Sequence, residues 1–139
     1  MKRKASAVWR GGLKDGKGTI STDSGVLKDT QYSFATRFES GVGTNPEELI
    51  AAAHAGCFAM AFSAELGKAS LTPDSISATA TVTLDKTNEG FIVTESHLDV
   101  TAKVPGADRA KVTEIANAAK AGCPISRLLK ANVTMDLNL

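Results

Sequence analysis

The chain is poor in aromatic residues, and its charges nearly cancel. Only 5% of its 139 residues are aromatic, and 16 basic side chains stand against 15 acidic ones, a formal net charge of +1. A nucleic-acid-binding protein usually carries a basic excess concentrated on one face. The one dense basic run, Lys2-Arg3-Lys4, lies at a chain end, where a solvated terminus is expected. The composition therefore predicts no nucleic-acid partner.

Membrane and secretion signals are also missing. The start of the chain lacks the charged and then apolar pattern of a secretory signal, and no apolar run reaches the roughly 20 residues that span a bilayer. We therefore expect a soluble, cytoplasmic protein with no membrane partner. Thiols stay reduced in that compartment, so two cysteines are more often catalytic, metal-binding or inert than a structural bridge.

Length and pattern predict a single α+β domain over residues 1–139. Alternation and turn residues indicate a hairpin of Ala5–Arg10 with Gly18–Ser21, and a third strand over Tyr32–Phe38 with Arg37 on the face opposite its aromatic rings. Further strands are expected at 75–87, 91–104 and 133–139, and further helices at 107–121 and 125–131. This order favours a largely antiparallel sheet.

The clearest helix signal begins at Asn45, which can cap the helix before Pro46 at its first position, with Glu48 placed to close a capping box. The helix is expected to run to Leu66 and end near Gly67. Its residues are apolar almost all round, which indicates burial on most sides. A second subunit covering this helix is the simplest explanation, so we predict a homodimer.

The two cysteines are the main candidates for chemistry. Cys57 lies mid-helix, where its residue type is more simply explained as a small buried hydrophobic residue, and its reactivity would require a nearby cation. Cys123 lies between Gly122 and Pro124, at a helix break. The cysteines are 66 positions apart, so they form no CxxC motif, and the spacing leaves open whether they meet.

Other interpretations of the polar residues stay open at this point. His54, Cys57, Cys123 and His97 offer zinc-ligand chemistry, but the second closely spaced ligand pair of a structural site is absent. Glu47 and Glu48 are explained as first-turn acids, and Arg37 as a surface residue. Phosphate-loop, GxGxxG, GxSxG and HExxH motifs are missing. The residues alone therefore predict an α+β protein with two suggestive cysteines.

Two cysteine motifs give the chain a family resemblance. The segment 43–58, GTNPEELIAAAHAGCF, and the segment 121–126, AGCPIS, resemble the hallmark segments of the OsmC/Ohr family of osmotically inducible proteins and organic hydroperoxide reductases. The segments 21–27, 36–39, 45–49 and 84–86 are similar to the OsmC branch in particular. The likeness spans essentially the whole chain.

This resemblance implies an OsmC-like fold with a buried central helix, in an intertwined homodimer whose active sites lie at the subunit interface. It implies a thiol peroxidase in which Cys57 attacks organic hydroperoxides, and hydrogen peroxide more weakly, and Cys123 resolves the product as a disulfide. Arg37 and Glu47 match the active-site arginine and glutamate, with Arg10 as the alternative arginine. A dithiol reductant of lipoyl or thioredoxin type would reopen the disulfide, and no cofactor or metal is implied.

Helix geometry bears on the role of Glu47. Ten residues of straight helix separate Glu47 from Cys57 by about 15 Å. We therefore expect Glu47 to serve the site of the opposite subunit or to act through Arg37. The alternative function is a stress-related small-molecule binding protein whose cysteines take no part in chemistry.

Overall fold

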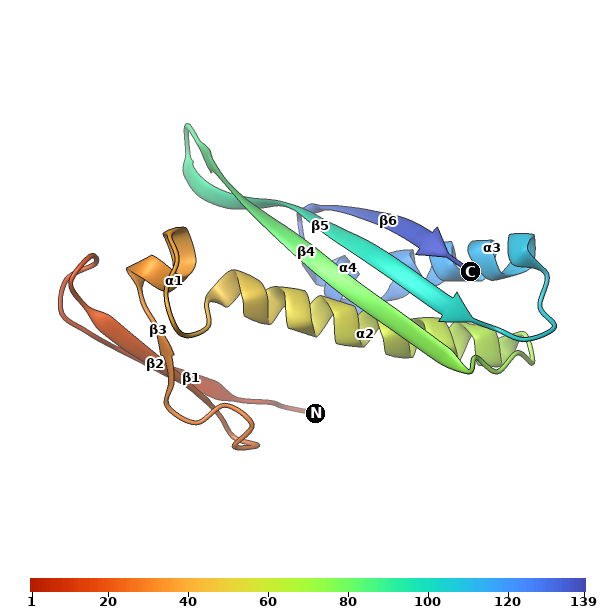
Figure 1. Cartoon of the computed structure of the whole chain (residues 1–139), viewed down its shortest axis with the longest axis horizontal. Coiled ribbons are helices and arrows are strands. Elements are labelled where there is room, and N and C mark those ends of the chain that lie inside the picture. The colour runs from red at the N-terminus through yellow and green to blue at the C-terminus, as the bar shows by residue number, and fades with distance from the viewer. The chain divides into compact units, whose positions relative to one another are not determined.

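The computed structural model describes all residues, 1–139, and divides them into two compact units, Met1–Leu49 and Ile50–Leu139. Figure 1 labels the elements in chain order. They are β1 (Ala5–Arg10), β2 (Lys17–Thr22), β3 (Thr30–Tyr32), α1 (Phe34–Phe38), α2 (Pro46–Lys68), β4 (Ser75–Thr87), β5 (Gly90–Lys103), α3 (Arg109–Gly122), α4 (Pro124–Leu128) and β6 (Asn132–Asn138). The single domain predicted for the whole chain stays a prediction.

The first unit is built on the antiparallel sheet β1-β2-β3. The predicted hairpin is confirmed, with Ala5 opposite Thr22 and Arg10 opposite Lys17. The rings of Trp9 and Tyr32 lie 5.5 Å apart on this sheet. A Cβ atom at Gly18 would collide with the Tyr32 ring, so glycine is required where the rings cross the central strand.

A short helix replaces most of the strand expected over Tyr32–Phe38. Strand β3 ends at Tyr32, and α1 follows at once. The Ser33 hydroxyl accepts a hydrogen bond from the Thr36 backbone N–H, and the Thr36 hydroxyl accepts one from the Ser33 N–H at 2.8 Å. This reciprocal capping box satisfies two helix-end donors. The strand prediction was wrong because local capping outweighed the alternation of side chains, and Arg37 consequently lies in the last turn of a helix.

Helix α2 begins as predicted, but its burial differs from the expectation. The Asn45 side chain accepts from the Glu48 backbone N–H at 2.8 Å, while the Glu48 carboxylate takes the Thr44 hydroxyl as its partner at 3.0 Å. Only His54, Phe58, Phe62 and Leu66 are buried, a single stripe at four-residue spacing. Within one chain, the predicted burial on most sides is therefore not found.

By length and composition, α2 is the one helix that could cross a membrane. Core helices share that property, so the finding is weak evidence for a membrane span.

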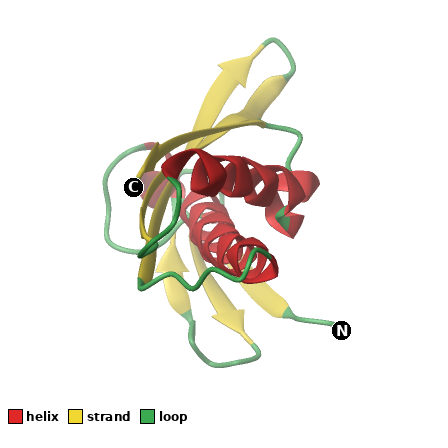
Figure 2. Ribbon diagram, turned by 90° about the vertical axis from the view of Figure 1, so that its right-hand side faces the viewer, coloured by secondary structure: helices red, strands yellow, loops and turns green.

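The second unit packs helices against one face of the sheet β4-β5-β6. Strands β4 and β5 are antiparallel, and β6 runs parallel to β5. Figure 2 shows the two long helices next to each other. The core joins side chains of α2, β5 and α3, and its largest members are Phe58, Phe62, Leu66, Leu98, Val100, Val112 and Ile115. The side chains of β5 alternate, so Ser96 and Leu98 face this core whereas His97 and Asp99 lie on the opposite face.

Candidate functional site

Two thiols 66 positions apart meet in the second unit. Cys57 belongs to α2, and Cys123 lies between α3 and α4. Their sulfur atoms are 3.0 Å apart, so the two thiol groups share one S–H···S hydrogen bond. Both cysteines are free thiols. A disulfide bond is about 2.05 Å long, so a shift of roughly 1 Å would bring the sulfurs to bonding distance.

The break between two helices positions Cys123. This residue ends α3 and begins α4, with φ −55° and ψ 127°. The extended ψ follows from Pro124, whose ring disfavours helical geometry in the residue before it. Cys123 is fully buried and Cys57 is only partly buried. Cys57 is therefore the thiol that a small molecule can reach.

Burial works against the ionisation of Cys57. Desolvation raises the pKa of the Cys57 thiol, and the hydrogen bond with Cys123 raises this pKa further, whereas a hydrogen bond with the backbone of Ile125 lowers it. The thiolate is the nucleophilic form of cysteine. Rapid reaction at Cys57 therefore requires a positive charge in addition to the groups that surround its thiol.

His54 ties together the elements that carry the cysteines. It lies one helical turn before Cys57 and is fully buried. Its Nδ1 is 2.6 Å from the Ser96 hydroxyl of β5, and its Nε2 is 2.8 Å from the Ser126 hydroxyl of α4. Burial lowers the pKa of His54, so the neutral form is favoured. The sequence indicated His54 only as a candidate zinc ligand, so this role was missed; a lone histidine in an apolar helix was the one available signal of a buried polar partner.

The zinc ligands considered from the sequence do not converge. Ser96, the partner of His54, faces the core, and His97 is the next residue along β5, so its side chain points to the opposite face. His54 has both ring nitrogens engaged by hydroxyl groups. His97 therefore belongs to a different surface from the two cysteines.

Arg37 and Glu47 form a two-pronged ion pair in the first unit. Arg37 Nη2 lies 2.7 Å from Glu47 Oε1, and Arg37 Nε lies 3.1 Å and 3.2 Å from the two carboxylate oxygens. The Glu47 side chain is 12% exposed and that of Arg37 is 39% exposed. The guanidinium carbon also lies 5.3 Å from the centre of the Phe38 ring. Such a fork fixes the orientation of the arginine.

Arg10, the alternative arginine, has a different setting. It ends β1 and is exposed, and it forms no side-chain hydrogen bond or ion pair. Of the two candidates, Arg37 is thus the one that the structure holds in a fixed orientation.

An apolar cavity of about 250 Å³ adjoins the Arg37 guanidinium. Arg37 is the one charged residue in the lining. The residues that line the cavity are Trp9, Leu13, Tyr32, Ser33, Phe34, Arg37 and Phe38. A ligand with an apolar body and one polar end fits this chemistry. Phe38 lines this cavity, whereas Phe58 is buried in the core against Phe62.

Comparisons with known proteins identify the family of this chain. The family model of OsmC-like proteins matches residues 39–138. Peroxiredoxin OsmC of Escherichia coli (strain K12) is 53% identical over 137 residues, which cover 99% of this chain and 96% of that protein. Organic hydroperoxide resistance protein OhrB of Bacillus subtilis (strain 168) is 32% identical over 136 residues, or 97% and 96% of the two chains.

Solved structures match over nearly the full length. The crystal structure of Bacillus subtilis OhrB has a TM-score of 0.72 at 33% identity and covers 98% of this chain and 97% of its own. An organic hydroperoxide resistance protein OsmC from Legionella pneumophila has a TM-score of 0.71 at 26% identity, covering 97% and 95%. The predicted α+β fold is confirmed, and the chain belongs to the OsmC-like protein family.

Proposed function

We propose that this protein is a cysteine-based peroxidase that reduces organic hydroperoxides to alcohols and, more slowly, hydrogen peroxide to water. The observation that carries this proposal is the 3.0 Å approach of the Cys57 and Cys123 sulfur atoms. Two relatives that span nearly the whole chain, named Peroxiredoxin OsmC and Organic hydroperoxide resistance protein OhrB, support a peroxidase-type function.

The proposed reaction has two steps on the protein. The Cys57 thiolate attacks the terminal oxygen of the hydroperoxide, the O–O bond breaks, and the departing alkoxide takes a proton to leave as the alcohol. Cys57 becomes a sulfenic acid. The Cys123 sulfur then attacks the Cys57 sulfur, an S–S bond forms and water leaves. The short sulfur–sulfur distance makes this second step faster than further oxidation.

Arg37 supplies the missing positive charge in this proposal. Burial raises the pKa of Cys57, so the thiolate needs a cation. Glu47 holds the Arg37 guanidinium through both carboxylate oxygens, which leaves Nη1 free of this pair. Because ten residues of helix separate Glu47 from Cys57, we place this pair at the cysteines of the opposite subunit in a homodimer.

The cavity beside Arg37 accounts for the substrate class. Its aromatic and aliphatic lining suits the organic part of an alkyl hydroperoxide, and the guanidinium can donate hydrogen bonds to the peroxide oxygens. Hydrogen peroxide lacks the organic part and gains nothing from that lining. We further propose that a dithiol of lipoyl or thioredoxin type reopens the disulfide by exchange in the cytoplasm.

Cysteine variants test the proposal. With an alkyl hydroperoxide and a dithiol reductant, we expect Cys57→Ser to show no turnover above the uncatalysed rate. Cys123→Ser should complete one turnover and then accumulate sulfenic and sulfinic acid on Cys57. Ala118→Ser, an exposed change on α3 away from both cysteines, serves as the control and should retain the wild-type rate.

The outcomes separate this proposal from its rival. Wild-type protein that fails to consume peroxide, or Cys57→Ser protein that consumes it normally, would support a small-molecule binding protein with bystander cysteines. Circular dichroism of each variant checks that the fold is retained.

A further inference from the structure

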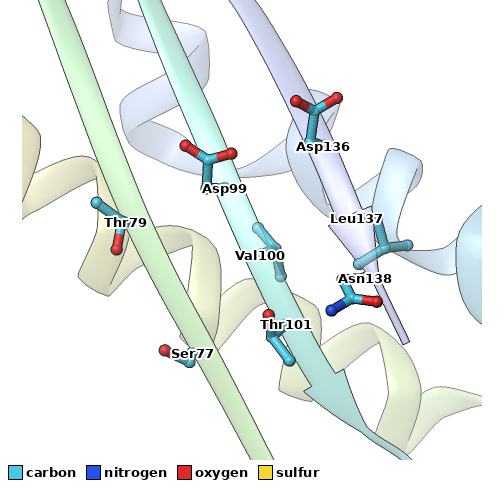
Figure 3. Close-up of a pocket in the computed structure, with 8 residues that line it drawn as sticks. All are labelled: Ser77, Thr79, Asp99, Val100, Thr101, Asp136, Leu137 and Asn138. Carbon is cyan, nitrogen blue, oxygen red and sulfur yellow. The ribbon is translucent and has the colours of Figure 1, made fainter.

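The outer face of the β4-β5-β6 sheet carries a cluster of metal-ligand side chains away from the cysteines. His97 and Asp99 come from β5 and Asp136 from β6. His97 Nε2 is 3.4 Å from Asp99 Oδ1 and 3.3 Å from Asp136 Oδ2. Figure 3 shows the two aspartates on adjacent strands with their carboxylates on the same side of the sheet. The ligand atoms of the three residues lie within 4.8 Å of one another.

The strand register makes this cluster unfavourable without a cation. Asp99 is the direct cross-strand partner of Asp136 in the parallel pair β5-β6. Like charges placed opposite each other in a sheet are destabilising. Neither carboxylate has a lysine or arginine partner, and His97 is the one basic group that both of them face. The register therefore places two carboxylates together with His97 as the one basic side chain beside both.

The distances fit a tetrahedral metal ion. Zinc bonds to histidine nitrogen and carboxylate oxygen are about 2.0–2.2 Å long, which places neighbouring ligand atoms of a tetrahedral site about 3.3–3.6 Å apart. Both His97 separations agree with this spacing. The aspartate side chains are 60% and 83% exposed, so they can rotate to close the third separation.

Thr134 hydrogen-bonds the ring nitrogen of His97 that would not bind the metal, as is usual for metal-binding histidines. His97 Nδ1 lies 2.6 Å from the Thr134 hydroxyl on β6. When that hydroxyl accepts the Nδ1 hydrogen, the lone pair of Nε2 points toward the two carboxylates. Metal-binding histidines usually fix their ring and tautomer through the other ring nitrogen in this way.

A shallow groove of about 290 Å³ borders the cluster and includes both aspartates. Figure 3 displays its lining: Ser77, Thr79, Asp99, Val100, Thr101, Asp136, Leu137 and Asn138. Three protein ligands leave one tetrahedral position open, and this polar groove has room for water there.

We propose that His97, Asp99 and Asp136 bind one divalent transition-metal ion, Zn²⁺ in the first instance, with an open fourth position beside the groove. The site is independent of the proposed peroxidase chemistry, because His97 faces away from the core that holds the cysteines. It takes a metal through one imidazole and two carboxylates, and the ion neutralises the opposed aspartates.

Calorimetric titration of the full chain with Zn²⁺ tests this site. We expect one ion per chain, and at least tenfold weaker binding in His97→Ala and in Asp136→Asn. Thr134→Val should also weaken binding, by about 10–100-fold, because it removes the hydrogen bond that fixes the ring and tautomer of His97. Asp85→Asn makes the same charge change on the same sheet, outside the cluster, and should bind as the wild type does.

A background without thiols removes the competing soft ligands. The double variant Cys57→Ser/Cys123→Ser should bind Zn²⁺ with the wild-type affinity. The proposal is overturned if the wild type binds no stoichiometric Zn²⁺, if His97→Ala binds as tightly as the wild type, or if binding disappears with the cysteines.

Discussion

At Cys57 the surroundings that bring the second sulfur close also oppose ionisation. The Cys123 sulfur is 3.0 Å away, yet burial raises the pKa of the Cys57 thiol. A buried thiol with a raised pKa is ordinarily inert. The proposed peroxidase resolves this conflict only if a cation reaches Cys57, and the Arg37 guanidinium, fixed by Glu47, is the group that we assign to that task.

Arg37→Ala should therefore reduce the rate of peroxide reduction by about 100-fold, as for the loss of one donor to a developing negative charge. The stability should change little, since the Arg37 side chain is 39% exposed and ion pairs near the surface contribute about 0–1 kcal/mol. The rate of Cys57 alkylation as a function of pH gives the thiol pKa, which should rise in the variant.

The matched variant is Arg10→Ala, which decides between the two candidate arginines. Wild-type kinetics in Arg10→Ala are expected. The assignment of Arg37 fails if Arg10→Ala loses activity while Arg37→Ala keeps both its rate and its thiol pKa.

The buried hydrogen bonds of His54 should contribute measurably to the free energy of unfolding. The ring joins Ser96 and Ser126, and its removal leaves two hydroxyl groups without their partner. His54→Ala should lower the free energy of unfolding by about 2–4 kcal/mol, from lost packing and lost hydrogen bonds. Ala118→Ser, an exposed change on α3, should alter it by less than about 0.5 kcal/mol.

The loss of unfolding free energy in His54→Ala should depend on pH. Because burial lowers the pKa of His54, the unfolded state binds its proton more readily than the folded state does. The stabilisation from neutral His54 is complete above the ordinary histidine pKa of about 6.5 and is lost as pH falls toward the lower folded pKa. The wild type and His54→Ala should therefore differ less at pH 5.5 than at pH 7.5 in urea unfolding, and an equal gap at both values would contradict the account.

At the level of elements, helix signals with local capping were the most predictable. Asn45 and Pro46 placed the start of α2 correctly, because both act through the adjacent backbone. The same chemistry at Ser33 and Thr36 was hidden under an alternating pattern, so α1 was predicted as strand. The strands over 75–87 and 90–103 were predictable because their alternation is long and a turn joins them.

The packing within one chain does not explain why the exposed face of α2 is apolar. Met60 is 77% exposed at its centre. The exposed residues around Met60 are small: Ala52, Ala53, Gly56, Ser63 and Ala64. A long apolar helix with only one buried stripe is the expected state of an element that packs against a second subunit.

Met60→Asp should thus weaken the proposed homodimer, because a charge buried at an interface without a partner costs several kcal/mol. Sedimentation velocity should show a dimer for the wild type and a shift toward monomer for the variant. Val26→Asp, the same kind of change at a position 85% exposed between β2 and β3, should stay dimeric. A wild type that is monomeric at micromolar concentration would refute the proposed assembly.

At the scale of the whole molecule, the sequence indicated the fold class and the family, but not the meeting of distant side chains. No spacing rule could place Cys57 beside Cys123, or His54 between Ser96 and Ser126, because packing of separate elements creates these contacts. The Arg37–Glu47 pair was expected from the family resemblance, and its two-pronged geometry required coordinates. The cluster of His97 with Asp99 and Asp136 depends on the register of β5 with β6, which the sequence does not reveal.

The most direct test of the central claim is the mass of the protein after treatment with one equivalent of an alkyl hydroperoxide. The account predicts that the intact chain loses the mass of two hydrogen atoms and that peptide mapping finds Cys57 joined to Cys123 within the same chain. A chain of unchanged mass, or one that gains oxygen on Cys57 while Cys123 stays a free thiol, would contradict it.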